Sequence, residues 1–258
     1  MTETLDDPLT IAGQSFTSRL LIGSSSFPNN QVMLDSIEAS DAQIVTVAIR
    51  RVDLGGGSEN ILDLLDGNYF ILPNTAGCFT SAEALRTLRL AREIGGWKLV
   101  KLEVLGDKKS LLPDMIETLK STEVLSKEGF KVMVYCNDDP LIAKRLENAG
   151  AVAIMPLAAP IGSGLGIQNH TNIKIMRKQT KLPLIIDAGI GEASDAVIAM
   201  ELGCDGVLIN TAIAQAQKPT EMAKAMKYAV ISGRKSYLSG RIKKNLMGFA
   251  STSKKGII

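Results

Sequence analysis

The chain alternates short apolar segments with longer amphipathic segments along most of its 258 residues. The apolar segments are rich in Val, Ile and Leu, as strands that are buried on both faces usually are. The amphipathic segments repeat apolar residues at helical spacing, and several end at a glycine, where a helix cap needs left-handed backbone. Eight apolar segments can be distinguished, at residues 19–24, 43–49, 69–74, 98–104, 131–136, 151–157, 183–189 and 206–210.

This alternation predicts a parallel sheet covered by helices. Eight strand–helix units in about 250 residues is the usual size of a closed (β/α)8 barrel, the TIM barrel, so we expect one α/β domain over residues 1–258. The alternative is an open doubly wound sheet, but its glycine-rich nucleotide turn should follow the first strand, where this chain reads IGSSSF. Before that strand, LTIAGQSFTSR alternates around a glycine, which predicts a short N-terminal hairpin that plugs the barrel bottom.

Composition argues against several classes of protein. The net charge of +2 gives no strong field for binding nucleic acid or an anionic membrane, and no apolar run reaches membrane-spanning length. Cys78, Cys136 and Cys204 are far apart and odd in number, which disfavours a disulfide framework or a zinc site. We expect three reduced core cysteines and a protein that binds neither nucleic acid nor membranes.

The fourth apolar segment carries two charged residues in its middle. In WKLVKLEV, strand alternation places Leu99, Lys101 and Glu103 on one face and three apolar residues on the other. The apolar face suits the helix layer, so Lys101 and Glu103 should point into the barrel near the carboxyl end of the strand. Catalytic groups of TIM-barrel enzymes lie at that end.

A lysine in such a place has a specific chemistry. Burying an isolated ammonium is costly, so the group must pair with a carboxylate or lower its pKa. We expect the site to keep Lys101 partly neutral, and a neutral lysine is a nucleophile that forms an imine with ketones and aldehydes. A neighbouring carboxylate can move the protons that this step requires. We predict that Lys101 and Glu103 are catalytic; the alternative is a structural ion pair that fills the barrel.

A second inward carboxylate is expected from LPLIIDAGIG, where Asp187 follows two isoleucines at the end of a strand. It is a candidate acid or base at the same rim as Lys101. The alternative is a structural cap, because aspartate beside glycine is common in turns.

Three loops rich in small residues follow the last three strands: PIGSGLG, DAGIG and NTAIA. TIM barrels commonly bind phosphate at the loops after strands seven and eight, where backbone N–H groups can approach the ligand. Each loop alone is typical of an ordinary turn, but the three together predict a phosphorylated substrate.

Other polar residues fit a structural role better. His170 is the only histidine, which rules out a histidine triad, and its place just before a predicted helix indicates a surface or capping residue. Arg50 and Arg51 could contact an anion or anchor their loop through Asp53, and we favour the structural role. The tail at residues 240–258 is basic and most simply a flexible, solvated end.

The chain also resembles a known family. In order along nearly the whole chain, it resembles the thiazole synthases of bacterial and plastid thiamine biosynthesis in TSRLLIGS, TVAIRRVDL, LPNTAG, KLEVLGD, LLPDMIETLKSTEVL, MPLAAPIGSG, DAGIG and VLINTAIA. The resemblance implies a (β/α)8 barrel that joins 1-deoxy-D-xylulose 5-phosphate, dehydroglycine and the C-terminal thiocarboxylate of a sulfur-carrier protein into thiazole phosphate. Ala158 departs from the family pattern, in which glycine is expected, and the C-terminal tail matches loosely.

The resemblance also implies roles for individual residues. Lys101 would form the imine with the sugar ketone, and Glu103 and Asp187 would be the acid and base groups. The residues implied in phosphate and sugar binding are Gly162, Ala188, Gly189, Asn210 and Thr211. No metal or bound organic cofactor is implied. A homotetramer is expected, in the cytoplasm or the plastid stroma.

Two other functions remain open at this point. Lysine, carboxylates and phosphate loops would equally suit another Schiff-base aldolase or isomerase acting on a sugar phosphate. A non-catalytic barrel that binds a phosphorylated metabolite is the alternative outside enzymes.

Overall fold

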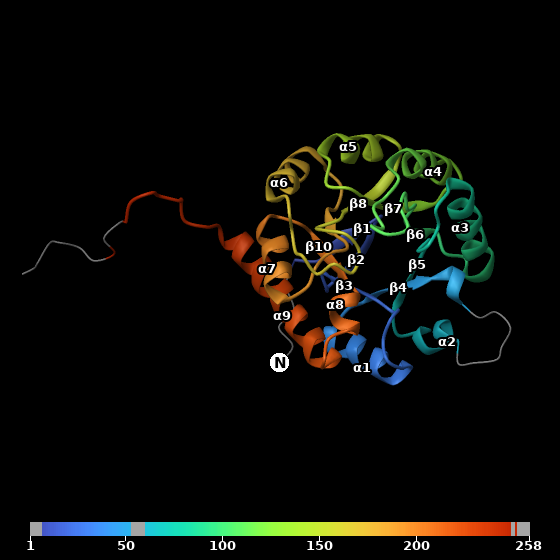
Figure 1. Cartoon of the computed structure of the whole chain (residues 1–258), viewed down its shortest axis with the longest axis horizontal. Coiled ribbons are helices and arrows are strands. Elements are labelled where there is room, and N and C mark those ends of the chain that lie inside the picture. Colours follow the sequence, from blue (N-terminus) through green and yellow to red (C-terminus); the bar gives the residue numbers. More distant parts are fainter. Residues whose placement is uncertain (1–6, 53–59, 249–250, 252–258) are drawn as a thin grey trace, which may run out of the picture.

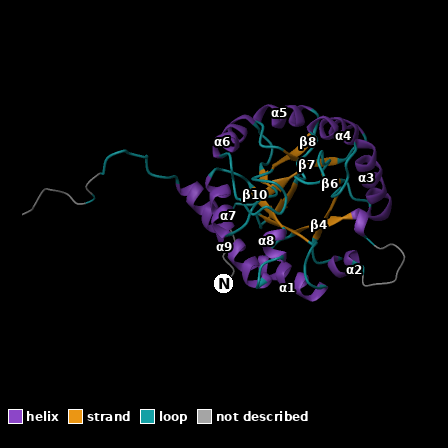
Figure 2. Ribbon diagram, in the orientation of Figure 1, coloured by secondary structure: helices purple, strands orange, loops and turns teal. Residues whose placement is uncertain are grey.

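The computed structural model describes residues 7–52, 60–248 and 251. Within them, eight parallel strands form one sheet in the order β8-β7-β6-β5-β4-β3-β10-β9, and the helices form a ring outside it (Figures 1 and 2). The strands are β3 (Leu20–Gly23), β4 (Ile44–Ala48), β5 (Phe70–Asn74), β6 (Leu99–Leu102), β7 (Lys131–Cys136), β8 (Ala151–Pro156), β9 (Ile185–Ile186) and β10 (Gly206–Ile209).

The sheet closes on itself. Parallel bridges join Ile154 to Leu184 and Leu157 to Asp187, which brings β8 and β9 together. The predicted TIM barrel is therefore confirmed, and the open sheet is excluded. The expectation of one domain over residues 1–258 stays a prediction, because part of that range lies outside the described residues.

Each strand is followed by helical structure on the outside of the barrel (Figure 1). The helices are α1 (Asn30–Ser40), the 3-10 turn η1 (Ile49–Arg51), α2 (Ile61–Leu65), α3 (Ser81–Gly95), α4 (Met115–Lys127), α5 (Pro140–Asn148), α6 (His170–Gln179), α7 (Ala193–Glu201), α8 (Thr211–Ala214) and α9 (Pro219–Ser239). Side-chain caps fix several helix starts: the carboxylate of Asp114 accepts the N–H groups of Ile116 and Glu117 at the start of α4. Among the described residues, none of the helices is long and apolar enough to cross a bilayer.

An N-terminal hairpin closes the lower end of the barrel. Strands β1 (Leu9–Ile11) and β2 (Gln14–Phe16) pair antiparallel. Leu9, Ile11 and Phe16 are buried and pack against inward-facing residues of the barrel strands, such as Leu21 and Leu72. The predicted plug is therefore confirmed.

The alternation predicted for the fourth strand is also confirmed. Val100, Leu102 and Val104 belong to the core between strands and helices, whereas Leu99 belongs to the core inside the barrel. Lys101 and Glu103 share the inward face with Leu99 because side chains alternate along a strand.

The seventh barrel strand is much shorter than the predicted range of 183–189. Regular pairing in β9 covers Ile185–Ile186 only, with an isolated bridge at Asp187. Ala188 and Gly189 have φ angles of +22° and +86°, which lie outside the β region, so the chain leaves the strand directly after Asp187.

Candidate active site

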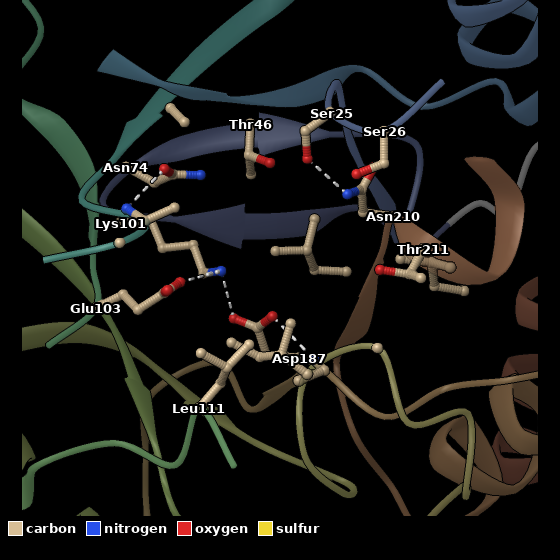
Figure 3. A pocket seen from close by; sticks show the side chains of 18 of the residues that line it. Ser25, Ser26, Thr46, Asn74, Lys101, Glu103, Leu111, Asp187, Asn210 and Thr211 are labelled. Atoms are coloured by element: carbon tan, nitrogen blue, oxygen red, sulfur yellow. Dashed lines mark hydrogen bonds and ion pairs between the residues drawn. The ribbon is translucent and has the colours of Figure 1, made fainter. Parts of the chain in front are cut away.

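A cavity of about 310 Å³ opens at the carboxyl ends of the barrel strands. Its lining includes every one of the site residues expected from the sequence, namely Lys101, Glu103, Gly162, Asp187, Ala188, Gly189, Asn210 and Thr211 (Figure 3). The structure thus brings them together from four different strand ends, although their roles stay predictions.

The amine of Lys101 lies between two carboxylates at the base of this cavity (Figure 3). Its Nζ atom is 2.8 Å from Oδ2 of Asp187 and 3.8 Å from Oε2 of Glu103. The side chains of the three residues are 6%, 8% and 7% exposed, respectively. The closer partner is therefore Asp187, which is distant in the sequence, and not the neighbouring Glu103.

Hydrogen bonds hold the carboxylate of Asp187 and the backbone of Glu103. The backbone N–H of Ala188 donates to Oδ1 of Asp187 at 2.9 Å, and the N–H of Asp187 donates to the carbonyl of Pro156 at 3.0 Å. The backbone of Glu103 exchanges two hydrogen bonds with Thr75, whose Oγ1 accepts from its N–H at 2.7 Å and donates to its carbonyl at 2.6 Å. Both acids are therefore held in place independently of the lysine.

The opposite part of the cavity is built from small residues and helix α8. Gly162 and Gly189 have φ angles of +74° and +86°, and a Cβ on Gly189 would lie 2.4 Å from the backbone nitrogen of Ala159. The amide of Asn210 donates to Oγ of Ser25 at 2.8 Å, just before α8 begins at Thr211. Glycine is thus required where the backbone borders the space that was expected to hold phosphate.

Comparison with known proteins identifies the family. A family model described as "Thiazole biosynthesis protein ThiG" matches residues 10–253. The thiazole synthase of Pelagibacter ubique is 68% identical over 98% of this chain and 100% of its own length. The thiazole synthase of Maricaulis maris is 58% identical over 98% of this chain and 96% of its own.

The chain belongs to the thiazole synthase family of thiamine biosynthesis. A solved structure agrees: the crystal structure of the Amycolatopsis orientalis BexX/CysO complex contains a chain with a TM-score of 0.84 and 31% identity, covering 94% of this chain and all of that one. Mandelate oxidase, at 12% identity and a TM-score of 0.59, shares the fold alone. The family consists of enzymes, so the resemblance noted in the sequence and the expectation of an enzyme are confirmed.

The charge state of Lys101 differs from the one expected for this thiazole synthase. Burial by itself lowers the pKa of Lys101, but attraction to Asp187 and then to Glu103 outweighs it, and the pKa is raised above the ordinary lysine value. The expectation of a partly neutral lysine is therefore wrong for the resting site. One cation beside two acids is held as an ammonium.

Burial has the opposite consequence for the acids. It is the largest influence on the pKa of both Glu103 and Asp187, and it raises each above its ordinary value despite the nearby ammonium. All three groups therefore hold protons more tightly than they would in water. A site of this kind can pass one proton among its members, as general acid–base chemistry requires.

Tyr135, next to the lysine, was not among the residues expected from the sequence. Its side chain is fully buried, its ring centroid is 5.7 Å from Nζ of Lys101, and its hydroxyl finds no hydrogen-bond partner among the described residues. Strand alternation in KVMVYC was the available signal, because Val132 and Val134 face the helices and Tyr135 lies on the other face.

The remaining candidates separate clearly. His170 is exposed at the start of α6 and is not part of the cavity lining, as expected. The three cysteines are free and buried. Arg50 donates to the carbonyl of Gly77, which fits the structural role favoured for it, whereas Arg51 lines the cavity, and the structural role favoured for Arg51 stays a prediction. The expected partner Asp53 lies outside the described residues.

Two further expectations concern the metal and the tail. Across the described ranges, no group of three or more His, Cys, Asp and Glu side chains is arranged to hold a metal ion. Residues 240–248 and 251 are exposed, as expected for a solvated end, and the rest of the tail lies outside the described residues.

Proposed function

We propose that this chain condenses 1-deoxy-D-xylulose 5-phosphate, dehydroglycine and the sulfur of a carrier-protein thiocarboxylate into thiazole phosphate, with Lys101 forming an imine to the sugar. One observation carries the proposal. The amine of Lys101 lies 2.8 Å from one buried carboxylate and 3.8 Å from another. The same cavity is lined by the loops rich in small residues that follow the last three strands.

Imine formation begins with a proton transfer. Lys101 passes its proton to a neighbouring carboxylate, which burial has already made a stronger proton acceptor, and this leaves an uncharged amine. The amine nitrogen adds to the sugar ketone carbon, and the carbonyl oxygen leaves as water after accepting two protons, one from the site and one from the nitrogen. The uncharged amine and the protonated carboxylic acid also cost less desolvation free energy than the charged pair in a site shielded from water.

The imine then activates the sugar. A protonated imine withdraws electrons, so the adjacent C–H becomes acidic and one carboxylate removes its proton. Returning a proton at the next position moves the carbonyl along the sugar. The thiocarboxylate sulfur adds to this carbonyl, and the carrier leaves as its carboxylate with the former carbonyl oxygen, so the sulfur stays on the sugar. The sulfur then adds to the imine carbon of dehydroglycine, whose nitrogen replaces the Lys101 amine on the sugar and frees the lysine. The neighbouring sugar hydroxyl leaves as water.

The loops around Gly162, Ala188, Gly189, Asn210 and Thr211 are proposed to bind the phosphate and the sugar. Positive φ angles at Gly162 and Gly189 and the absence of side chains there let backbone N–H groups approach an anion. Fixing the phosphate at this side of the cavity would hold the ketone near Lys101. Positioning of this kind lowers the barrier by removing the entropic cost of encounter.

The partner and the assembly are also part of the proposal. The similar chain BexX was crystallised in a complex with CysO, which supports a protein partner for this chain, and we propose a sulfur carrier in that role. The scheme uses the lysine imine in place of a metal or organic cofactor. The homotetramer stays a prediction, and light scattering on the purified protein checks it.

Borohydride reduction tests the central step. The sugar phosphate is added to the protein, the imine is reduced, and the modified residue is located by mass spectrometry. We expect the adduct on Lys101, its loss in Lys101→Met, and a fall in turnover of at least about 10,000-fold in that variant. Lys98→Met is the matched control, because Lys98 is an exposed lysine just before the same strand. An adduct elsewhere, or none, contradicts the proposal.

The other functions that the sequence left open are now less well supported. A Schiff-base aldolase or isomerase would trap a sugar phosphate on the same lysine, but it would need neither dehydroglycine nor a carrier protein. A non-catalytic barrel would retain pathway output after Lys101→Met. Family membership favours the condensation, and thiazole release that depends on all three reactants would separate it from both.

A further inference from the structure

The two arginines after β4 have different surroundings. Arg50 is tied down, because its guanidinium donates to the carbonyl of Gly77 and contacts Sγ of Cys78 at 3.8 Å. Arg51 follows it in the turn η1 and lines the active-site cavity. Within the described residues, the side chain of Arg51 makes no hydrogen bond or ion pair. The turn is anchored by one arginine, and the other is left available at the cavity.

The charges around the cavity make this arginine distinctive. Among the described lining residues, the charged side chains are Arg51, Lys101, Glu103 and Asp187. Lys101 is already engaged by both carboxylates at 2.8 and 3.8 Å. Arg51 is close enough to Glu103 to lower its pKa slightly against the larger effect of burial, but it forms no contact ion pair with it. It is therefore the lining cation not committed to a carboxylate of the described chain.

The strand order places Arg51 opposite the loop of Gly162 and two to three strands from the other proposed phosphate loops. In a ring of eight strands closed between β8 and β9, β4 lies opposite β8, whose loop carries Gly162. The loop of Gly189 follows β9, three strands from β4, and Asn210 follows β10. A sugar phosphate that reaches from these loops to Lys101 on β6 would leave the Arg51 side of the cavity for another reactant.

We propose that Arg51 is a second anion-binding residue, which holds the carboxylate-type group of the reactant that joins the Lys101-bound sugar. This inference rests on the proposed function. Two reactants carry such a group, dehydroglycine as a carboxylate and the carrier tail as a thiocarboxylate. A guanidinium binds either through two parallel N–H donors, a geometry that an ammonium cannot offer.

Steady-state kinetics of Arg51→Gln test the inference. The KM of each reactant is measured in turn, with dehydroglycine supplied by glyoxylate and ammonium. We expect the KM of one of the two anionic reactants to rise about 10- to 100-fold, with kcat at saturation largely retained, because one charge-assisted contact is lost. Which KM rises identifies the source of the anion. Arg51→Lys should fall between the two proteins, since it keeps the charge without the forked geometry.

Two controls separate this inference from its alternatives. Arg86→Gln removes the same charge from an exposed position on α3 outside the cavity lining, and it should change neither KM. Borohydride trapping of the sugar phosphate on Lys101 should proceed normally in Arg51→Gln. Normal trapping with both KM values unchanged overturns the inference alone, and so does impaired trapping with the KM of the sugar phosphate raised. Absence of the adduct in the unmodified protein overturns the proposed function, and the inference with it.

Discussion

The two ends of the barrel both contain a buried cation, but the ratio of acidic to basic side chains around it is opposite. At the carboxyl end, Lys101 lies between two acids whose side chains are at most 8% exposed. At the other end, Arg19 and Arg234 share one acid, with Asp7 Oδ2 at 2.9 Å from Arg19 Nη2 and 2.6 Å from Arg234 Nε. Asp7 is 30% exposed. One end has an excess of acids in a dry site, and the other has an excess of bases near water.

Protons respond differently at the two ends. Burial raises the pKa of Glu103 and Asp187, whereas the hydrogen bond from Arg234 is the largest influence on Asp7 and lowers its pKa. An arginine does not release its proton in a protein, but a lysine can. The site of Lys101, at the upper end, is therefore able to move a proton. The cluster of Arg19, Arg234 and Asp7, at the lower end, is a fixed ionic clamp.

The lower cluster holds the hairpin in place. Besides its ion pair with the carboxylate of Asp7, Arg19 donates hydrogen bonds to the backbone carbonyl oxygens of Asp7, Pro8 and Asp205, at 3.2, 3.3 and 2.6 Å. These contacts join the segment before β1 to the turn before β10. Arg234 of α9 reaches the same acid. Buried charge alone therefore does not indicate catalysis, and the ratio of acids to bases and the identity of the cation are more informative.

After loss of the lysine itself, the largest effect is expected at Asp187, the acid nearest Lys101. Asp187→Asn should lower thiazole formation about 100- to 10,000-fold, because the amide cannot exchange protons with the imine intermediate. Trapping of the sugar phosphate on Lys101 should remain, since removal of the nearest negative charge favours the uncharged amine and Glu103 can still accept its proton. Turnover is measured beside mass-spectrometric trapping. Unchanged turnover would show that Asp187 serves the structure alone.

At the other end, Arg19→Met should act on stability and leave turnover unchanged. The variant keeps an apolar stem but leaves three partly buried carbonyl groups without their donor and removes one of the two cations that pair with Asp7. We expect the free energy of unfolding to fall by about 3 kcal/mol, measured with urea. Arg89→Met removes an exposed pair with Glu128 and should cost less than about 1 kcal/mol. Equal losses in the two variants would refute the clamp.

The architecture could be predicted from the sequence because it depends on local patterns. Apolar segments separated by helical spacing gave eight strands, and the alternation in one of them placed Lys101 and Glu103 inside the barrel. The turns rich in small residues that follow the last three strands could be recognised for the same reason. Strand ends were less predictable: Asp187 lies just past a strand of two residues, since the backbone turns away at Ala188.

Contacts between distant segments were beyond the sequence. Alternation could not show that Asp187 lies closer to Lys101 than Glu103 does, since that distance depends on how the barrel closes. The resting charge of Lys101 was wrongly predicted for the same reason, because the close approach of Asp187, at 2.8 Å from the amine, could not be read from the sequence. Arg50 and Arg51 could not be distinguished in the sequence, where they are adjacent basic residues. In the structure they differ because Arg50 donates a hydrogen bond to the carbonyl of Gly77.

The upper end can be probed through the pH dependence of stability. The pKa of Glu103 is raised by burial, so the folded protein binds this proton more tightly than the unfolded chain does. The stability from this group is fully present below the ordinary pKa of a glutamate and is lost as the pH rises through the raised value. Glu103→Gln stays neutral throughout. The free energy of unfolding of the Glu103→Gln variant, relative to that of the wild type, should therefore increase from about pH 5 upward. A constant or decreasing difference would contradict a raised pKa at Glu103.

The smallest effect is expected at Asp7, with the opposite sign. Its pKa is lowered by the hydrogen bond from Arg234 and by the charges of the two arginines, so its contribution to stability is present above the ordinary pKa of an aspartate and is lost as the pH falls through the lowered value. Asp7→Asn should cost up to about 1 kcal/mol at pH 7, because the acid is partly exposed, and the cost should vanish in acid. Urea unfolding from pH 7 to pH 2 measures it. If the cost of Asp7→Asn grew in acid, the two ends of the barrel would not differ in the way their proton affinities require.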